Sequence, residues 1–258
     1  MKGRDAAWLV LLALCLVFML GPLVLVVLFS FGSNALIGFP MGGLTLSWYG
    51  KLIADEAFRD AARVSLVVAL SVAILSTIVG TAAAVALGRM PPKWTRPVLA
   101  VISVPVLLPP LVIAIAIVVL VVRGLGLRLG LPTVVLGHVL VTQPFVILIV
   151  MARLASFGTA SVEAARDLGA TRWQAFRLVT LPQIRAAVIG AALISASISL
   201  DDFIIASFTI GGGNTLSTFV WGKLRTTLDP SINAIATILL LSTIGMSVLA
   251  LRLTRYRG

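Results

Sequence analysis

The chain reads Ala6-Ala-Trp-Leu-Val-Leu-Leu-Ala-Leu-Cys-Leu-Val-Phe-Met-Leu-Gly-Pro-Leu-Val-Leu-Val-Val-Leu-Phe29 near its N-terminus, a run of 24 residues without a charged side chain. At roughly 1.5 Å per residue, an α-helix of this length crosses a hydrocarbon core about 30 Å thick. A cleaved signal peptide would have a shorter apolar region followed by a small-x-small cleavage site. We therefore expect residues 6–29 to form an uncleaved first transmembrane span.

The rest of the chain repeats this pattern. Of its 258 residues 60% are hydrophobic and 11% are charged, too few charges for a soluble domain to cover its surface. Five further apolar blocks are each 18 to 25 residues long and fall at 64–87, 98–122, 133–152, 184–208 and 234–251. The sequence therefore predicts an all-α membrane protein with six transmembrane helices in a single transmembrane domain, residues 1–258.

Basic residues are distributed unevenly between the two sides of the predicted membrane domain. The segments on the side of the two termini hold thirteen of the twenty Lys and Arg, and the opposite segments hold seven. Basic residues accumulate on the cytoplasmic side of membrane proteins, so both termini are expected in the cytoplasm. This topology explains the net charge of +11 better than nucleic-acid binding, because the arginines lie between apolar blocks.

A polar segment between the fourth and fifth predicted spans, residues 153–183, is too patterned for a linker. It contains Ser161-Val-Glu-Ala-Ala-Arg-Asp-Leu-Gly169. Ser161 is a plausible N-cap for a short helix, and Gly169 can end it. Trp173, Phe176 and Val179 then recur at helical spacing, and Pro182 is expected to start the fifth span. These features predict a helical hairpin at the cytoplasmic surface.

This segment resembles the EAA loop of the permease subunits of bacterial ABC importers. The likeness covers about twenty residues and matches the motif at Glu163, Ala164, Ala165, Gly169, Leu181 and Pro182, with Val179 in place of Ile. The resemblance implies that Glu163 to Gly169, including Asp167, is a coupling helix that docks on a separate ATPase. The alternative is a membrane-surface helix without a partner.

Two acidic residues lie within the predicted fifth span, where an ionisable side chain is costly and often functional. Ser195, Ser199 and Asp202 share one helical face, and Asp201 lies on a neighbouring stripe. We interpret these four residues as the lining of a polar cavity whose carboxylates accept hydrogen bonds from a cationic amine. An ion pair with another subunit or a cap for a broken helix remains the alternative for the two acids.

Permeases of the spermidine/putrescine type carry stretches similar to Ser199–Phe203, Thr209–Gly212 and Leu228–Thr237 of this chain. The likeness covers nearly the whole sequence, and it implies a type I ABC importer fold and a polyamine substrate. Such permeases often have an acid after a proline early in the third span, whereas this chain has Pro109-Pro110-Leu111. An ABC permease for a different small solute therefore stays open.

The resemblance also implies the partners of the chain. They are a second, homologous permease, two ATPase subunits that bind ATP and Mg, and an external substrate-binding protein at a bacterial inner membrane. The chain itself has no Gly-x-x-x-x-Gly-Lys-Ser/Thr motif. With one cysteine, Cys15, and one histidine, His138, we expect no metal site, no cofactor and no enzymatic activity. A secondary transporter or channel, with Asp201 or Asp202 as proton carrier, is the alternative from another class.

Other intramembrane residues are assigned structural roles. His138, Thr142 and Gln143 lie on the predicted fourth span and are expected to form helix–helix hydrogen bonds. Pro105, Pro109 and Pro110 are expected to kink the third span.

Overall fold

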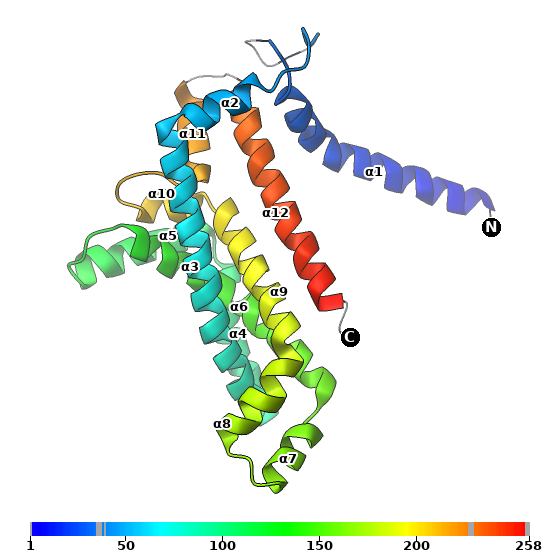
Figure 1. Cartoon of the computed structure of the whole chain (residues 1–258), viewed down its shortest axis with the longest axis vertical. Helices are drawn as coiled ribbons and strands as arrows, with labels where there is room; N and C mark the ends of the chain where they lie inside the picture. The colour runs from blue at the N-terminus through cyan, green and yellow to red at the C-terminus, as the bar shows by residue number, and fades with distance from the viewer. Residues whose placement is uncertain (1, 35–37, 39, 227–229, 256–258) are drawn as a thin grey trace. The chain divides into compact units, whose positions relative to one another are not determined.

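The computed structural model describes residues 2–34, 38, 40–226 and 230–255. Its chain divides into two compact units, Met1–Asp60 with Phe219–Leu241, and Ala61–Thr218 with Ser242–Gly258. Figure 1 shows helices throughout, and the one β feature among the described residues is an isolated bridge between Gly32 and Leu44. Leu228 and Asp229, which open the last of the three quoted stretches, lie outside the described residues.

The first unit contains α1 (Lys2–Phe29), α2 (Ser47–Ala54), the start of α3 (Glu56–Leu87), most of α11 (Leu216–Thr226) and the first part of α12 (Ser231–Arg255). The expected first span is confirmed as one helix, and its apolar side chains from Trp8 to Leu20 are exposed, as lipid-facing side chains would be. Near the ends of its helices, Lys223 Nζ lies 3.1 Å from Asp55 Oδ2. Outside the apolar segments of this unit, a polar contact therefore joins α11 to Asp55, the residue that follows α2.

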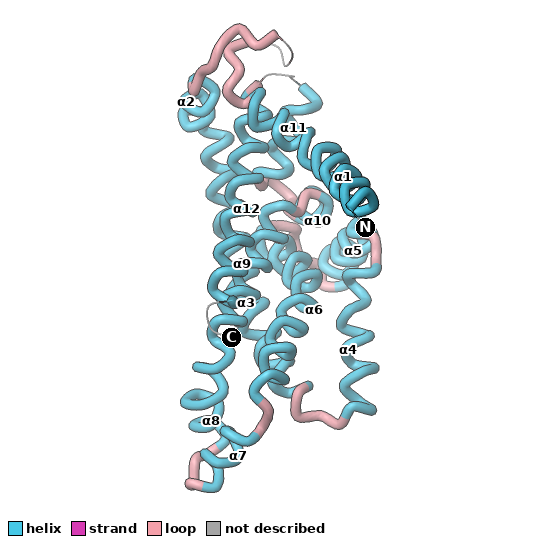
Figure 2. The backbone as a smooth tube through the Cα atoms, turned by 90° about the vertical axis from the view of Figure 1, so that its right-hand side faces the viewer, coloured by secondary structure: helices cyan, strands magenta, loops and turns pink. Residues whose placement is uncertain are grey.

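The second unit is built around α3, α6 (Leu131–Phe157) and α9 (Leu181–Asp201), and Figure 2 shows α6 and α9 running side by side. One of its buried clusters joins Val146 and Ile147 of α6 to Ala84 of α3 and Ile184 of α9. Gly80 makes this packing possible, because a Cβ there would lie 2.5 Å from Val146 Cγ1. Small residues allow such close approach of helices in membranes.

Five described helices are long and apolar enough to span a membrane, and a sixth span is present only if one bent pair counts. That pair is α4 (Pro92–Leu107) with α5 (Pro110–Val118), which continues as the π-helix η1 (Val119–Gly124). The two parts are bent by 96°, so the expectation of one kinked helix over 98–122 is corrected to a broken one. Pro109 and Pro110 explain the break, because each lacks an N–H donor and the residue before a proline is driven out of the helical region.

The expected fifth span, 184–208, is also interrupted. α9 ends at Asp201, Asp202 has extended backbone angles, and α10 (Ile204–Thr209) follows. At its other end the helical stretch is longer than expected, because α8 (Arg172–Ala175), the π-helix η2 (Phe176–Thr180) and α9 run on from Arg172 to Asp201. Pro182 lies in the first turn of α9, as expected for the start of the fifth span, but the helical stretch begins earlier, at Arg172.

Candidate functional site

One end of the second unit is formed by α7 (Ala160–Asp167) and α8, as Figures 1 and 2 show. Ser161 does not cap α7, contrary to expectation: the helix starts one residue earlier, and Thr159 occupies the N-cap without a side-chain hydrogen bond. Gly169 does end the helix, with φ +87°. The Gly169 N–H donates to the Arg166 carbonyl at 2.9 Å, and the Ala170 N–H donates to the Ala165 carbonyl at 3.0 Å. This pair of bonds is a Schellman motif, which satisfies two carbonyls at the helix end.

The second half of the hairpin is fixed by its own cap. Thr171 Oγ1 accepts from the Gln174 N–H at 3.2 Å, and Gln174 Oε1 accepts from the Thr171 N–H at 2.8 Å. This reciprocal pair is a capping box, and it starts α8 immediately after the Schellman turn. The rings of Trp173 and Phe176 lie 5.6 Å apart on the expected apolar stripe. The predicted helical hairpin is therefore confirmed, with a turn defined by hydrogen bonds on both sides.

The tip of the hairpin exposes apolar side chains together with the residues of the EAA motif. Leu168 is 90% exposed, Trp173 66% and Leu178 70%. Glu163, Ala164, Asp167 and Gly169 are exposed as well, whereas Ala165 is half-buried. Large exposed apolar side chains on a polar hairpin are typical of a segment that contacts another protein or a membrane.

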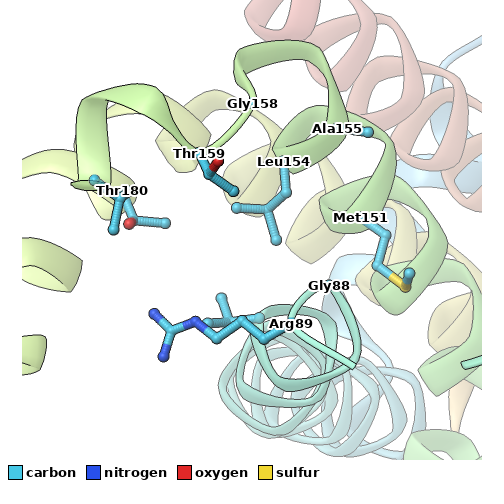
Figure 3. A pocket seen from close by; sticks show the side chains of 10 residues that line it. Gly88, Arg89, Met151, Leu154, Ala155, Gly158, Thr159 and Thr180 are labelled. Atoms are coloured by element: carbon cyan, nitrogen blue, oxygen red, sulfur yellow. The ribbon is translucent and has the colours of Figure 1, made fainter. Parts of the chain in front are cut away.

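Behind α7 lies a cavity of about 260 Å³, shown in Figure 3. Its walls come from the ends of α3 and α6, the start of α7 and the π-helix η2, and most of the lining is apolar. Arg89 and Thr180 add polar groups, and Thr180 Oγ1 is buried without a hydrogen-bond partner. The hairpin is therefore not packed tightly against the ends of α3 and α6, which leaves room for α7 to shift.

The four residues predicted to line a cavity occupy different environments in the second unit. Ser195 and Ser199 are buried, and Ser195 Oγ has no hydrogen-bond partner among the residues that the structure describes. Asp201 is exposed, whereas the side chain of Asp202 retains 18% exposure. Asp201 is the last residue of α9, and Asp202 follows it with extended backbone angles, so the two carboxylates have different surroundings.

Asp202 connects the broken ends of the fifth helical segment. Its Oδ1 accepts from the Ala206 N–H at 3.1 Å, and its main-chain carbonyl accepts from Ser217 Oγ at 2.7 Å. The first of these bonds satisfies an N–H that the start of α10 leaves without a helical partner. A cap for a broken helix, one of the two alternative roles, is thus observed for Asp202.

His138, on α6, contacts the same region. Its Nδ1 lies 2.8 Å from Ser199 Oγ, and its Nε2 lies 3.2 Å from Asp202 Oδ1 but out of line for a hydrogen bond. One turn further along, Thr142 Oγ1 and Ser76 Oγ are 2.7 Å apart. The predicted helix–helix hydrogen bonds of His138 and Thr142 are therefore confirmed, from α6 to α9 and from α6 to α3. No local sequence pattern indicates that His138 also reaches Asp202.

The described residues contain no group of three or more His, Cys, Asp or Glu side chains that could hold a metal ion. The polar residues of α6 and α9 can instead accept and donate hydrogen bonds within an apolar surrounding. Such an arrangement can orient a carboxylate toward a polar solute.

Comparison with known proteins identifies the protein family to which this chain is similar. Residues 76–257 match the family model described as "Binding-protein-dependent transport system inner membrane component". The putrescine transport system permease protein PotI of Escherichia coli (strain K12) is 34% identical over 246 residues, which cover 92% of this chain and 86% of that protein. The spermidine/putrescine transport system permease protein PotC of the same strain is 32% identical over 228 residues, 88% of this chain and 86% of that protein.

A solved structure shares the fold. The crystal structure of a bacterial alginate ABC transporter in complex with an alginate pentasaccharide-bound periplasmic protein contains a chain that matches with a TM-score of 0.69. The match covers 99% of this chain and 96% of that one at 17% sequence identity. At this identity, the likeness concerns the helical architecture alone.

Proposed function

We propose that this chain, which belongs to the family of binding-protein-dependent transport system inner membrane components, forms part of the membrane path of an ABC importer for a small cationic amine. The observation that carries the proposal is the exposed Asp201 at the end of an apolar helix, next to the half-buried Asp202. A carboxylate at membrane depth is costly in contact with lipid. We therefore place Asp201 against a water-filled path or a second permease.

The substrate class follows from charge and from the relatives. Asp201 and Asp202 give this region of the path negative charge, and carboxylates form strong, charge-assisted hydrogen bonds with ammonium groups. The named substrates of the two relatives, putrescine and spermidine, are amines of this kind. Ser195 and Ser199 would contribute hydroxyl groups after a small rearrangement, because both are buried in this conformation. Another small solute remains the second candidate, because Pro109-Pro110-Leu111 supplies no carboxylate.

The second part of the proposal concerns energy supply. We assign Glu163, Ala164, Ala165, Asp167 and Gly169 to a coupling helix that docks on a separate ATPase subunit, which binds ATP and Mg. The exposed Leu168, Trp173 and Leu178 supply apolar contact area around it. The cavity behind α7 allows the hairpin to shift when the ATPase subunits close.

The remaining partners and the orientation complete the proposal. A second permease subunit, homologous to this chain, forms the other side of the path, and two ATPase subunits and an external binding protein complete the complex. Both termini lie in the cytoplasm of a bacterial cell with the protein in its inner membrane, because the terminal side carries thirteen of the twenty basic residues. In this orientation the α7–α8 hairpin faces the cytoplasmic ATPase.

The test uses vesicles that contain this chain with its partner permease and ATPase subunits. Uptake of labelled putrescine should require ATP on the ATPase side and binding protein on the other, and it should persist when a protonophore abolishes the proton gradient. Uptake that needs the gradient and not ATP would instead support a secondary transporter. Asp201→Asn should weaken uptake of putrescine without reducing assembly of the complex; equal uptake by the variant would remove this residue from the path.

A further inference from the structure

The side chain of His138 bridges two helices at the break after α9. It is 1% exposed, and its two ring nitrogens point to two residues three positions apart on the neighbouring segment. Nδ1 contacts Ser199 Oγ at 2.8 Å, and Nε2 lies 3.2 Å from Asp202 Oδ1. Because Nδ1 contacts Ser199, the Nε2 edge lies beside the carboxylate, although out of line for a hydrogen bond in this conformation.

The carboxylate of Asp202 is held from one side. Oδ1 accepts from the Ala206 N–H and is also the atom near His138 Nε2. Among the described residues, Oδ2 has no hydrogen-bond or ion-pair partner. The side chain keeps 18% exposure, so it is not sealed inside the protein. An anchored Oδ1 beside a free Oδ2 gives the group a fixed direction in which to accept a donor.

The backbone around His138 is fixed relative to α10. A Cβ at the preceding residue, Gly137, would lie 2.5 Å from Ile205 Cγ2, so α6 and α10 are in direct contact there. Thr133 Oγ1, near the start of α6, also donates to the Thr209 carbonyl at 2.8 Å. The backbone that carries the imidazole is therefore held by close contacts between α6 and α10. We expect a small change of this side chain to affect Asp202 and not the packing of the helices.

We infer that His138 is the positioning residue of the proposed amine site: it holds Asp202 by Oδ1 and leaves Oδ2 to accept the ammonium group of the solute. The inference rests on the proposed function, because the amine site is part of that proposal. His138 itself touches the carboxylate and not the solute. The other role open to a buried histidine is structural, a tie between α6 and α9 through Ser199. The two roles use different ring nitrogens, and this difference makes them separable.

Two substitutions separate the nitrogens. The side-chain amide of His138→Gln reaches about as far as Nε2, so it can still donate toward Asp202. The amide of His138→Asn reaches about as far as Nδ1, so it can still bond Ser199 but leaves Asp202 without its neighbour. Thr142→Ala is the matched control. It removes a different buried polar group of α6, a hydroxyl one turn away that contacts Ser76 and not Asp202.

The first measurement is ATP-driven putrescine uptake by the assembled complex in vesicles. We expect His138→Asn to raise KM about tenfold relative to His138→Gln, because the polar contact beside Asp202 Oδ1 is then lost, while Thr142→Ala leaves KM unchanged. Equal KM values for Asn and Gln, or a higher KM for Gln, would show that the Ser199 contact is the one that matters. That result overturns the inference.

The second measurement does not depend on the solute. Because the chain has one histidine, ¹⁵N imidazole NMR of the complex with only this chain labelled gives one pair of ring signals, identified by their loss in His138→Gln. Asp202→Asn should shift the Nε2 signal more than the Nδ1 signal. If it does and putrescine is not transported, the proposed substrate is wrong while the positioning contact stands. An Nε2 signal that Asp202→Asn leaves in place overturns the inference whatever the substrate.

Discussion

Gly169 ends α7 in a backbone conformation that other residues avoid. Its φ is +87°, and a Cβ added there would meet no atom within 4 Å. Substitution therefore changes the backbone energy of the turn and adds no clash. An alanine in the left-handed region costs roughly 1–2 kcal/mol, which corresponds to a factor of about 5–30 in the equilibrium between the formed and the frayed turn. Asparagine tolerates this region better, and a β-branched valine tolerates it least.

The assay is ATP hydrolysis by the complex in lipid nanodiscs, with and without the external binding protein. Because the turn sets the direction in which α7 meets the proposed ATPase partner, we expect stimulation to fall in the order Gly169, Asn, Ala, Val. The alanine variant should lose stimulation by no more than about 5–30-fold, the shift calculated for the turn. Gly222→Ala is the control, since Gly222 also has open space around it but lies inside α11.

The order of the four residues is the informative result. Equal stimulation by the glycine and valine forms, with equal amounts of assembled complex, would refute the claim that this turn positions the coupling element.

Three further predictions concern stability, measured by thermal or denaturant unfolding of the detergent-purified chain. Gly80→Val should destabilise by about 1–3 kcal/mol, because its side chain would overlap Val146 across the α3–α6 contact; an unchanged midpoint would contradict that contact. Thr171→Ala should cost about 1 kcal/mol by removing the cap of α8, and Thr171→Ser should restore most of it. Burial raises the pKa of Asp55. The hydrogen bond from Lys223, the positive charge of Lys223 and two backbone N–H donors lower the pKa by more, so it lies below its ordinary value of 3.8. This ion pair stabilises the folded chain by at most about 1 kcal/mol, because it is partly exposed. The stabilisation is complete above pH 3.8 and is lost as the pH falls through the lower pKa that Asp55 has in the folded chain. Asp55→Asn should lower the midpoint at pH 7, and the difference from the native chain should shrink as the pH falls below 3.8.

The long apolar helices α1 and α6 could be predicted from apolar run length alone. Residues 6–29 and 133–152 lie within α1 and α6 because a bilayer requires every backbone group to be bonded within the segment, and a helix does this locally. The α7–α8 hairpin could be predicted equally well, because Gly169 and the apolar spacing after it are local signals. Thr159 and Ser161 are both acceptable at a helix start, so their choice depends on how α6 ends at Phe157.

The breaks in the helices were harder to predict. Pro109-Pro110 predicts a bend, but its size depends on the packing of α5 against α10, which no local pattern encodes. The break at Asp202 contains neither Gly nor Pro, and the carboxylate itself replaces the lost backbone hydrogen bond. His138 could be predicted to bond another helix, but its partners lie 61 and 64 positions away, at Ser199 and Asp202.

Contact between α7 and a separate ATPase subunit is the claim on which the proposed function depends most. Cysteine cross-linking tests it directly after Cys15→Ser removes the native thiol. Glu163→Cys and Leu168→Cys should each cross-link to a cysteine in the cleft of the ATPase subunit, with a yield that changes on ATP binding, whereas Thr45→Cys, on the opposite side of the proposed topology, should not. No cross-link from either hairpin position, or a cross-link from Thr45→Cys under the same conditions, would contradict the coupling role and the orientation together.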